Sequence, residues 1–258
     1  MAIHRAARFF DQAAGDYERA RPGYPRQAAE WLGKRLGLGP GTTVLDLAAG
    51  TGKLTRLLTT TGARVLAVEP VAGMRARLGD ALPELELYDG TAEAIPLPSA
   101  SVEAVTVAQA FHWFDGDRAL AEIHRVSRPA GWLAVVYNRR PLEDPLQAAL
   151  DQILRPHRGD TPSERSHRWR EAFDRTSLWR PVEQAGIAHA HSLDREGVVA
   201  RIASTSFVAA LPDRQRAALL DQVRALVADR PEPVALPYIC ELSLWQRVPP
   251  TRCQNRQS

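Results

Sequence analysis

The stretch that decides the fold is TVLDLAAGTG, at residues 43–52. Its first five residues are a short apolar run, interrupted by Asp46 and bounded by turn residues. Such a run is typical of a strand buried on both faces of a parallel sheet. Gly50 and Gly52 then let the backbone turn sharply and approach a ligand closely, because glycine has no Cβ. Residues 43–52 therefore predict a buried strand and a ligand-binding turn, followed by a helix that starts near Lys53.

Beyond this turn, strand-like and helix-like segments alternate along the chain. Four further strands are predicted at 64–69, 85–88, 102–109 and 132–137. Two late strands are expected at 182–193 and 234–248, with helices at 195–210 and 213–227 between them. Alternation of this kind indicates parallel strands joined by right-handed helical crossovers. We therefore predict an α/β fold, a Rossmann-like, doubly wound and mostly parallel seven-stranded sheet.

Length and composition favour one domain, because 258 residues with 45% hydrophobic content can bury a full core. We expect four parts within residues 1–258. They are a helical N-terminal cap at 1–40, a ligand-binding core at 41–140, a helical insertion or lid at 141–181, and the remainder of the sheet and helices at 182–248. The cap contains predicted helices at 9–20 and 26–36, and the insertion contains predicted helices at 142–155 and 169–179.

The charge pattern and the apolar runs narrow the function classes. The formal net charge is +3, and the arginines alternate with acidic residues instead of forming a basic block, which disfavours nucleic acid as a partner. No apolar run approaches membrane-spanning length, and the N-terminus lacks the apolar region of a signal peptide. Cys240 and Cys253 match no metal or redox motif, and no Asp, Glu and His set stands at metal-ligand spacing. We expect a cytoplasmic protein without a metal or a membrane partner.

Glu69 ends the second predicted strand, nineteen residues after Gly50. A carboxylate at this place can accept hydrogen bonds from ribose hydroxyls. Turn and acid together predict a nucleoside-binding site. A nicotinamide enzyme is disfavoured, because Thr55 stands where the third glycine of the dinucleotide fingerprint would be and no Tyr-x-x-x-Lys element follows.

Residues 44–52 resemble motif I of the class I S-adenosylmethionine-dependent methyltransferases, which has the pattern Asp-x-Gly-x-Gly-x-Gly. Ala48 replaces the first glycine, and we expect the chain to tolerate this through an ordinary φ at that position. The resemblance continues through Glu69, residues 90–98 and residues 107–114, and covers about half of the chain.

The resemblance implies S-adenosyl-L-methionine as the cofactor and places its parts. It implies that the methionine part lies beside Asp46 and the turn, and that the ribose lies on Glu69. The remaining cofactor-binding positions that it implies are Ala48, Gly50, Gly52, Pro70, Ala92, Glu93 and Gln109.

The N-terminal segment 10–25 resembles the lead-in of a small-molecule subgroup that includes trans-aconitate methyltransferase-like enzymes. In that subgroup the N-terminal helix closes over the cofactor. The resemblance therefore implies that Tyr17 and Arg21 hold the cofactor carboxylate, for which a guanidinium fork is suited. The alternative is that Tyr17 packs in the cap and Arg21 forms a surface ion pair.

The segment QAFHWF at 109–114 follows the fourth predicted strand, and we expect it to face the methyl-transfer centre. His112, Trp113 and Phe114 are the predicted substrate-binding residues. His112 is also the catalytic candidate, either as a general base or as a hydrogen-bonding group that orients an ionised carboxylate; a structural histidine is the alternative. Nucleic-acid amino-methyltransferases of this class carry an Asn/Asp-Pro-Pro-Tyr/Phe element here, and its absence argues against base methylation.

The sequence therefore predicts methyl transfer from S-adenosylmethionine to a small molecule. A carboxylate or hydroxyl oxygen of a metabolite or natural-product intermediate is the expected acceptor. Two alternatives stay open: a protein that binds the cofactor without catalysis, and a nucleic-acid or other N-methyltransferase. The oligomeric state is also open.

Overall fold

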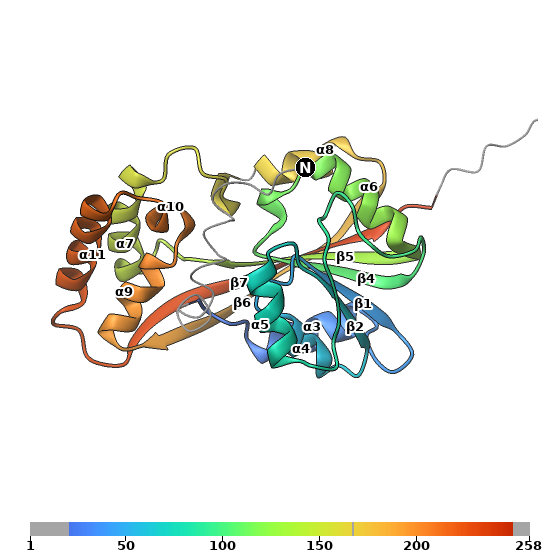
Figure 1. The fold of residues 1–258 in the computed structure, drawn as a ribbon, viewed down its shortest axis with the longest axis horizontal. Coiled ribbons are helices and arrows are strands. Elements are labelled where there is room, and N and C mark those ends of the chain that lie inside the picture. Colours follow the sequence, from blue (N-terminus) through green and yellow to red (C-terminus); the bar gives the residue numbers. More distant parts are fainter. Residues whose placement is uncertain (1–20, 167, 250–258) are drawn as a thin grey trace, which may run out of the picture.

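A computed structural model describes residues 21–166 and 168–249 (Figure 1). The predicted helix 9–20, with Tyr17, lies outside the described residues. The centre of the fold is a seven-stranded sheet with the order β3-β2-β1-β4-β5-β7-β6. Its strands are β1 (Thr43–Leu47), β2 (Arg64–Val68), β3 (Glu86–Tyr88), β4 (Val102–Ala108), β5 (Ser127–Arg139), β6 (Trp179–Leu193) and β7 (Val234–Arg247).

The sheet is mostly parallel, as predicted. Strands β1 to β5 pair with one another in parallel, and β7 runs antiparallel to both of its neighbours, β5 and β6. The described helices are α3 (Arg26–Leu36), α4 (Thr55–Thr59), α5 (Ala72–Ala81), α6 (Gly116–Val126), α7 (Pro145–Leu154), α8 (Glu171–Arg175), α9 (Arg195–Ala203), α10 (Ser206–Ala209) and α11 (Asp213–Val227). Short 3₁₀ turns are η1 (Phe111–Trp113), η2 (Arg155–His157), η3 (Glu164–Ser166) and η4 (Arg168–Arg170).

Helices cover both faces of the parallel part of the sheet, with α3, α4 and α5 on one side and α6 and α8 on the other (Figure 1). Successive side chains of a strand point to opposite faces, so β1 contributes to both layers. Val44 packs in the cluster that contains Leu32 of α3, and Leu45 packs in the cluster that contains Leu120 of α6. Burial on both faces explains why β1 is apolar almost throughout.

A third apolar cluster lies where β6 and β7 extend beyond the rest of the sheet (Figure 1). Helices α7, α9 and α11 pack there against the first half of β7, where Leu236 and Tyr238 are buried. None of the helices in the described ranges is long and apolar enough to cross a bilayer.

The main differences from the sequence-based expectation concern three predicted elements. The predicted helix 169–179 is instead η4 and α8, and β6 begins at Trp179, whose indole N–H donates to the Leu120 carbonyl at 3.1 Å. This contact holds the start of β6 against α6. The predicted helix 195–210 is interrupted at Ser204 and Thr205, and β5 begins at Ser127, five residues before the predicted start.

Candidate functional site

A cavity of about 440 Å³ lies at the carboxyl ends of the parallel strands. The residues that follow β1, β2 and β4 form its wall. Strand β1 lies between β2 and β4, so the strand order reverses beside β1. Ligands of open α/β sheets bind at such a reversal. The cavity therefore lies where the sequence predicted a ligand.

Glu69 connects the turn after β1 with the end of β2. Its carboxylate accepts the N–H of Gly50 at 2.7 Å and the N–H of Val71 at 2.8 Å. The side chain is only 3% exposed, and it is part of the cavity wall. Burial raises the pKa of Glu69 to about 7, while the two backbone N–H groups act in the opposite direction. An acceptor of this kind suits the hydroxyl groups of a ribose.

Asp46 lies behind the turn and is not among the cavity-lining residues. Its carboxylate accepts the hydroxyl of Thr55 at 2.6 Å and that of Thr106 at 3.0 Å, and it is 1% exposed. Burial raises the pKa of Asp46 to about 6, and the hydroxyl donors lower it. Asp46 thus fastens β1 to β4 and to the following helix, and its place beside the methionine part of the cofactor stays a prediction.

The glycines of the turn have different surroundings. Gly50 lines the cavity with φ 61°, and a Cβ there would lie 3.8 Å from the Met74 sulfur. Gly52 does not line the cavity: at φ 84° it is covered by Leu78, whose Cδ1 would lie 2.3 Å from an added Cβ. Gly50 thus shapes the ligand site, and Gly52 allows α5 to pack closely.

Ala48 adopts a left-handed conformation with φ 57°. The expectation of an ordinary φ at this position was wrong. Gln109, which follows β4, also has φ 57°, and both residues line the cavity. Left-handed backbone is costly for residues with a Cβ and is concentrated at functional sites. The two positions flank the same strand reversal.

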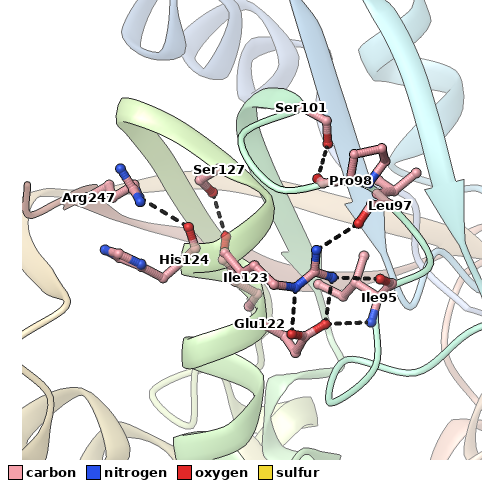
Figure 2. Close-up of polar contacts among 10 residues, drawn as sticks. Ile95, Leu97, Pro98, Ser101, Glu122, Ile123, His124, Ser127 and Arg247 are labelled. Atoms are coloured by element: carbon pink, nitrogen blue, oxygen red, sulfur yellow. Dashed lines mark hydrogen bonds and ion pairs between the residues drawn. The ribbon is translucent and has the colours of Figure 1, made fainter. Parts of the chain in front are cut away.

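The predicted adenine side is formed by Pro70, Ala92 and Glu93, all of which line the cavity, together with Met74. Figure 2 shows how the following loop is held: Glu122 of α6 accepts the N–H of Ile95 at 3.0 Å. Arg125 of the same helix donates to the carbonyls of Ile95 and Leu97, each at 2.8 Å.

Arg125 and Glu122 also pair with each other. This network fixes the loop at 91–97, and thereby Ala92 and Glu93, against α6.

The predicted substrate side follows β4 on the turn η1. His112, Trp113 and Phe114 all line the cavity. The Tyr137 hydroxyl lies 3.1 Å from His112 Nδ1 and accepts the His112 backbone N–H at 3.2 Å. Tyr137 therefore fixes both the backbone and the ring of His112. The two sides meet where Glu93 accepts the N–H of Asp115 at 2.9 Å.

Arg21 lines the cavity and donates to the Ser204 carbonyl at 2.7 Å, whereas Tyr17 lies outside the described residues. Sequence reasoning did not predict the other arginine and lysine side chains in the described wall as site residues. These are Lys53, Arg140, Arg158, Arg165 and Arg201. One available signal was the five arginines between residues 155 and 170.

Comparisons with known proteins agree on one family. A model of the family described as "Methyltransferase domain" matches residues 45–135. An uncharacterised methyltransferase of Mycobacterium tuberculosis is 38% identical, over 89% of this chain and 92% of that relative.

Two solved structures are similar. A provisionally named type II methyltransferase from Anaeromyxobacter dehalogenans has a TM-score of 0.66 and 27% identity, and the match covers 89% of this chain and 99% of that one. Geranyl diphosphate C-methyltransferase from Streptomyces coelicolor, solved with S-adenosyl-L-homocysteine, has a TM-score of 0.50 and 16% identity and covers 86% of this chain and 76% of that one. With the strand order and the turn after β1, these matches show that the chain belongs to the class I S-adenosylmethionine-dependent methyltransferases.

Proposed function

We propose that this enzyme transfers the methyl group to an oxygen atom of a small molecule, with a carboxylate as the first choice and a hydroxyl as the second. One observation carries the proposal. The cavity lined by Gly50 and Glu69 is also lined by His112, Trp113 and several arginines, so donor and acceptor can share one space.

The residues present fit the cofactor. Glu69 supplies a buried acceptor for ribose hydroxyls, and Pro70, Met74 and Ala92 supply apolar surface for a purine. Arg21 is the proposed partner of the cofactor carboxylate. When bound, S-adenosylmethionine supplies an activated methyl group on a sulfonium. The protein then contributes mainly proximity, orientation and exclusion of water.

We assign His112 the role of orienting the acceptor. Tyr137 accepts the His112 backbone N–H and lies within hydrogen-bond distance of Nδ1. In this proposal the Tyr137 hydroxyl donates its proton to Nδ1, which leaves the neutral ring protonated at Nε2. Nε2 is then a hydrogen-bond donor for an acceptor oxygen. An ionised carboxylate needs no base and suits this tautomer, whereas a hydroxyl acceptor needs the opposite tautomer, with Nε2 as the base.

The insertion at 141–181 is proposed to act as a lid. Of its described residues, five form part of the cavity wall, namely Arg158, Thr161, Pro162, Ser163 and Arg165. A wall of this kind restricts the cavity to ligands that fit inside it, which favours a small acceptor over a nucleic acid. Residues 10–25 resemble the lead-in of a subgroup that methylates small molecules, which also favours a small acceptor.

The test uses the full chain, methyl-labelled cofactor and a fractionated small-molecule extract, with the label located by mass spectrometry. We expect label on an oxygen of a small molecule. His112→Ala should lower kcat/KM about tenfold or more, equivalent to about 1.4 kcal/mol of transition-state stabilisation. Its affinity for S-adenosylhomocysteine should stay unchanged in isothermal titration calorimetry.

Tyr137→Phe should show part of the same loss, because it removes only the group that orients His112. Cofactor binding without label on any small molecule would contradict the proposal in favour of a protein that binds without catalysis. Label recovered on nucleic acid would contradict it in favour of base methylation.

A further inference from the structure

Three arginines of the cavity wall meet at one carboxylate, that of Asp151 on α7. Its Oδ1 lies 2.7 Å from Arg158 Nη2, 2.5 Å from Arg165 Nη1 and 3.9 Å from Arg140 Nη2. Arg140 follows β5, Arg158 follows η2 and Arg165 lies in η3, so three separate segments contribute. We call these three residues the arginine cluster. All three line the cavity, and Asp151 is not among the lining residues.

The arginine cluster has more positive charge than Asp151 neutralises. Arg158 and Arg165 both pair closely with the single carboxylate of Asp151, which can balance only one of their two charges, and the side chains of the cluster and of Asp151 are only 13% to 23% exposed. Nη2 of Arg165 is buried and has no hydrogen-bond partner in the described part of the chain. A buried donor without a partner is costly. A ligand oxygen in the cavity would satisfy it.

The wall of the cavity as a whole is also cationic. Its described residues include six basic side chains, Arg21, Lys53, Arg140, Arg158, Arg165 and Arg201, and three acidic ones, Glu69, Glu93 and Asp115. Arg201 is 8% exposed, and within the described residues it donates to the hydroxyls of Tyr238 and Thr205 and not to a carboxylate. Clustered like charges in a cleft with apolar walls attract ligands of opposite charge.

We propose that the arginine cluster binds a negatively charged oxygen group, a carboxylate or a phosphate, on the methyl acceptor. The inference rests on the proposed function and adds the substrate class: an acidic small molecule whose anionic end lies at Arg140, Arg158 and Arg165. Guanidinium groups recognise both oxyanions through paired, charge-assisted hydrogen bonds. Asp151 acts as a positioning residue that holds the guanidinium groups together.

A role limited to fastening the insertion onto α7 explains less of the geometry. The pair between Arg158 and Asp151, at 2.7 Å, would by itself be enough to link the segment after η2 to α7. Arg165 at the same oxygen adds repulsion between the two guanidinium groups without adding a second carboxylate. Their common exposure to the cavity is what an anion site requires.

The experiment measures binding of simple probes to the complex with S-adenosylhomocysteine, so it does not depend on turnover. The probes are succinate, inorganic phosphate and the neutral analogue succinamide, each at matched ionic strength. The readout is the rise in Tm with probe concentration, from which an apparent Kd follows. We expect succinate or phosphate, or both, to raise Tm in the millimolar range, and succinamide to have no effect.

Arg165→Gln and Arg158→Gln should each weaken probe binding about tenfold, as expected for the loss of a charge-assisted hydrogen bond. Arg224→Gln is the matched control: Arg224 lies on α11, pairs with Asp221 at 2.7 Å and does not line the cavity. It should bind the probes like the wild type. Retained binding of S-adenosylhomocysteine shows that each variant is folded.

Three results would overturn the proposal. They are anions that raise the wild-type Tm no more than succinamide does, equal probe binding by Arg165→Gln and Arg224→Gln, and a fall in S-adenosylhomocysteine affinity in Arg165→Gln. The last would assign the arginine cluster to the cofactor. Failure of the wild type to bind S-adenosylhomocysteine at all would instead contradict the methyltransferase function. Succinate and phosphate tested separately distinguish a carboxylate from a phosphate.

Discussion

Glu69 and Gly50 are nineteen residues apart in the sequence, and the Glu69 carboxylate accepts the Gly50 backbone N–H at 2.7 Å. This bond joins the turn after β1 to the end of β2. Because the same carboxylate also accepts the Val71 N–H, both of its oxygens are held in place at the cavity wall. The carboxylate that we propose to bind the ribose is thus positioned before any ligand binds, which reduces the cost of ordering the site.

Replacement of Glu69 by Gln should weaken cofactor binding. The neutral amide has one oxygen instead of two, and it loses the charge that strengthens hydrogen bonds from ribose hydroxyls. We expect S-adenosylhomocysteine to bind about tenfold or more weakly, equivalent to about 1.4 kcal/mol. Isothermal titration calorimetry at pH 8 measures this. Glu86→Gln, at an exposed ion pair with Arg64, is the control, and equal affinities of the two variants would refute the assignment.

Glu69 should also make the stability of the ligand-free protein depend on pH. Burial raises its pKa from 4.5 to about 7, so the folded state binds more protons than the unfolded state between these values. Stability therefore falls as pH rises through this window, by an amount on the order of 3 kcal/mol. Urea unfolding at pH 5 and pH 8 measures it. The loss of stability between pH 5 and pH 8 should be smaller in Glu69→Gln. If the stability of the wild type and of Glu69→Gln changed with pH in the same way, Glu69 would not be the cause of the pH dependence.

Ala48→Gly should stabilise the protein. Left-handed backbone at φ 57° costs about 1–2 kcal/mol for a residue with a Cβ. Glycine removes this cost but lowers stability by about 0.4–1 kcal/mol, because it increases the conformational entropy of the unfolded chain. A net gain of roughly 0.5–1 kcal/mol in the free energy of unfolding is expected. Ala49→Gly is the matched control, because Ala49 does not have a positive φ, and it should destabilise. A loss of stability in Ala48→Gly would show that the strain is relieved elsewhere.

Arg125→Met should loosen the loop that supplies Ala92 and Glu93. It removes two hydrogen bonds to the carbonyls of Ile95 and Leu97 and leaves Glu122 without its cation. We expect a loss of about 1–3 kcal/mol in the free energy of unfolding, since the side chain is about one-third exposed. Weaker binding of S-adenosylhomocysteine should accompany this loss.

The control for Arg125→Met is Arg64→Met, which breaks an exposed ion pair with Glu86. Its effect on stability should be clearly smaller, because water screens exposed pairs. If Arg125→Met lost stability but kept full affinity, the loop would not be part of the cofactor site.

The sequence by itself was sufficient to predict the succession of elements that form the site. These are a buried strand at 43–47, a glycine turn, and an acid at the end of the next strand. These features are local. Apolar periodicity and glycine placement are visible within a window of about ten residues. Gly50 and Glu69 could therefore be identified in advance, His112 was identified through the family resemblance of residues 107–114, and the structure places all three on one cavity.

Only the tertiary structure decided what surrounds these residues. It placed Asp46 behind the turn by setting Thr106 opposite it in β4, and it gave Ala48 its left-handed backbone. It also brought Arg140, Arg158 and Arg165 to one carboxylate. These facts depend on strand register and on how segments far apart in the chain pack together. A local pattern determines which element forms, whereas the tertiary packing of the whole chain determines which neighbours a side chain contacts.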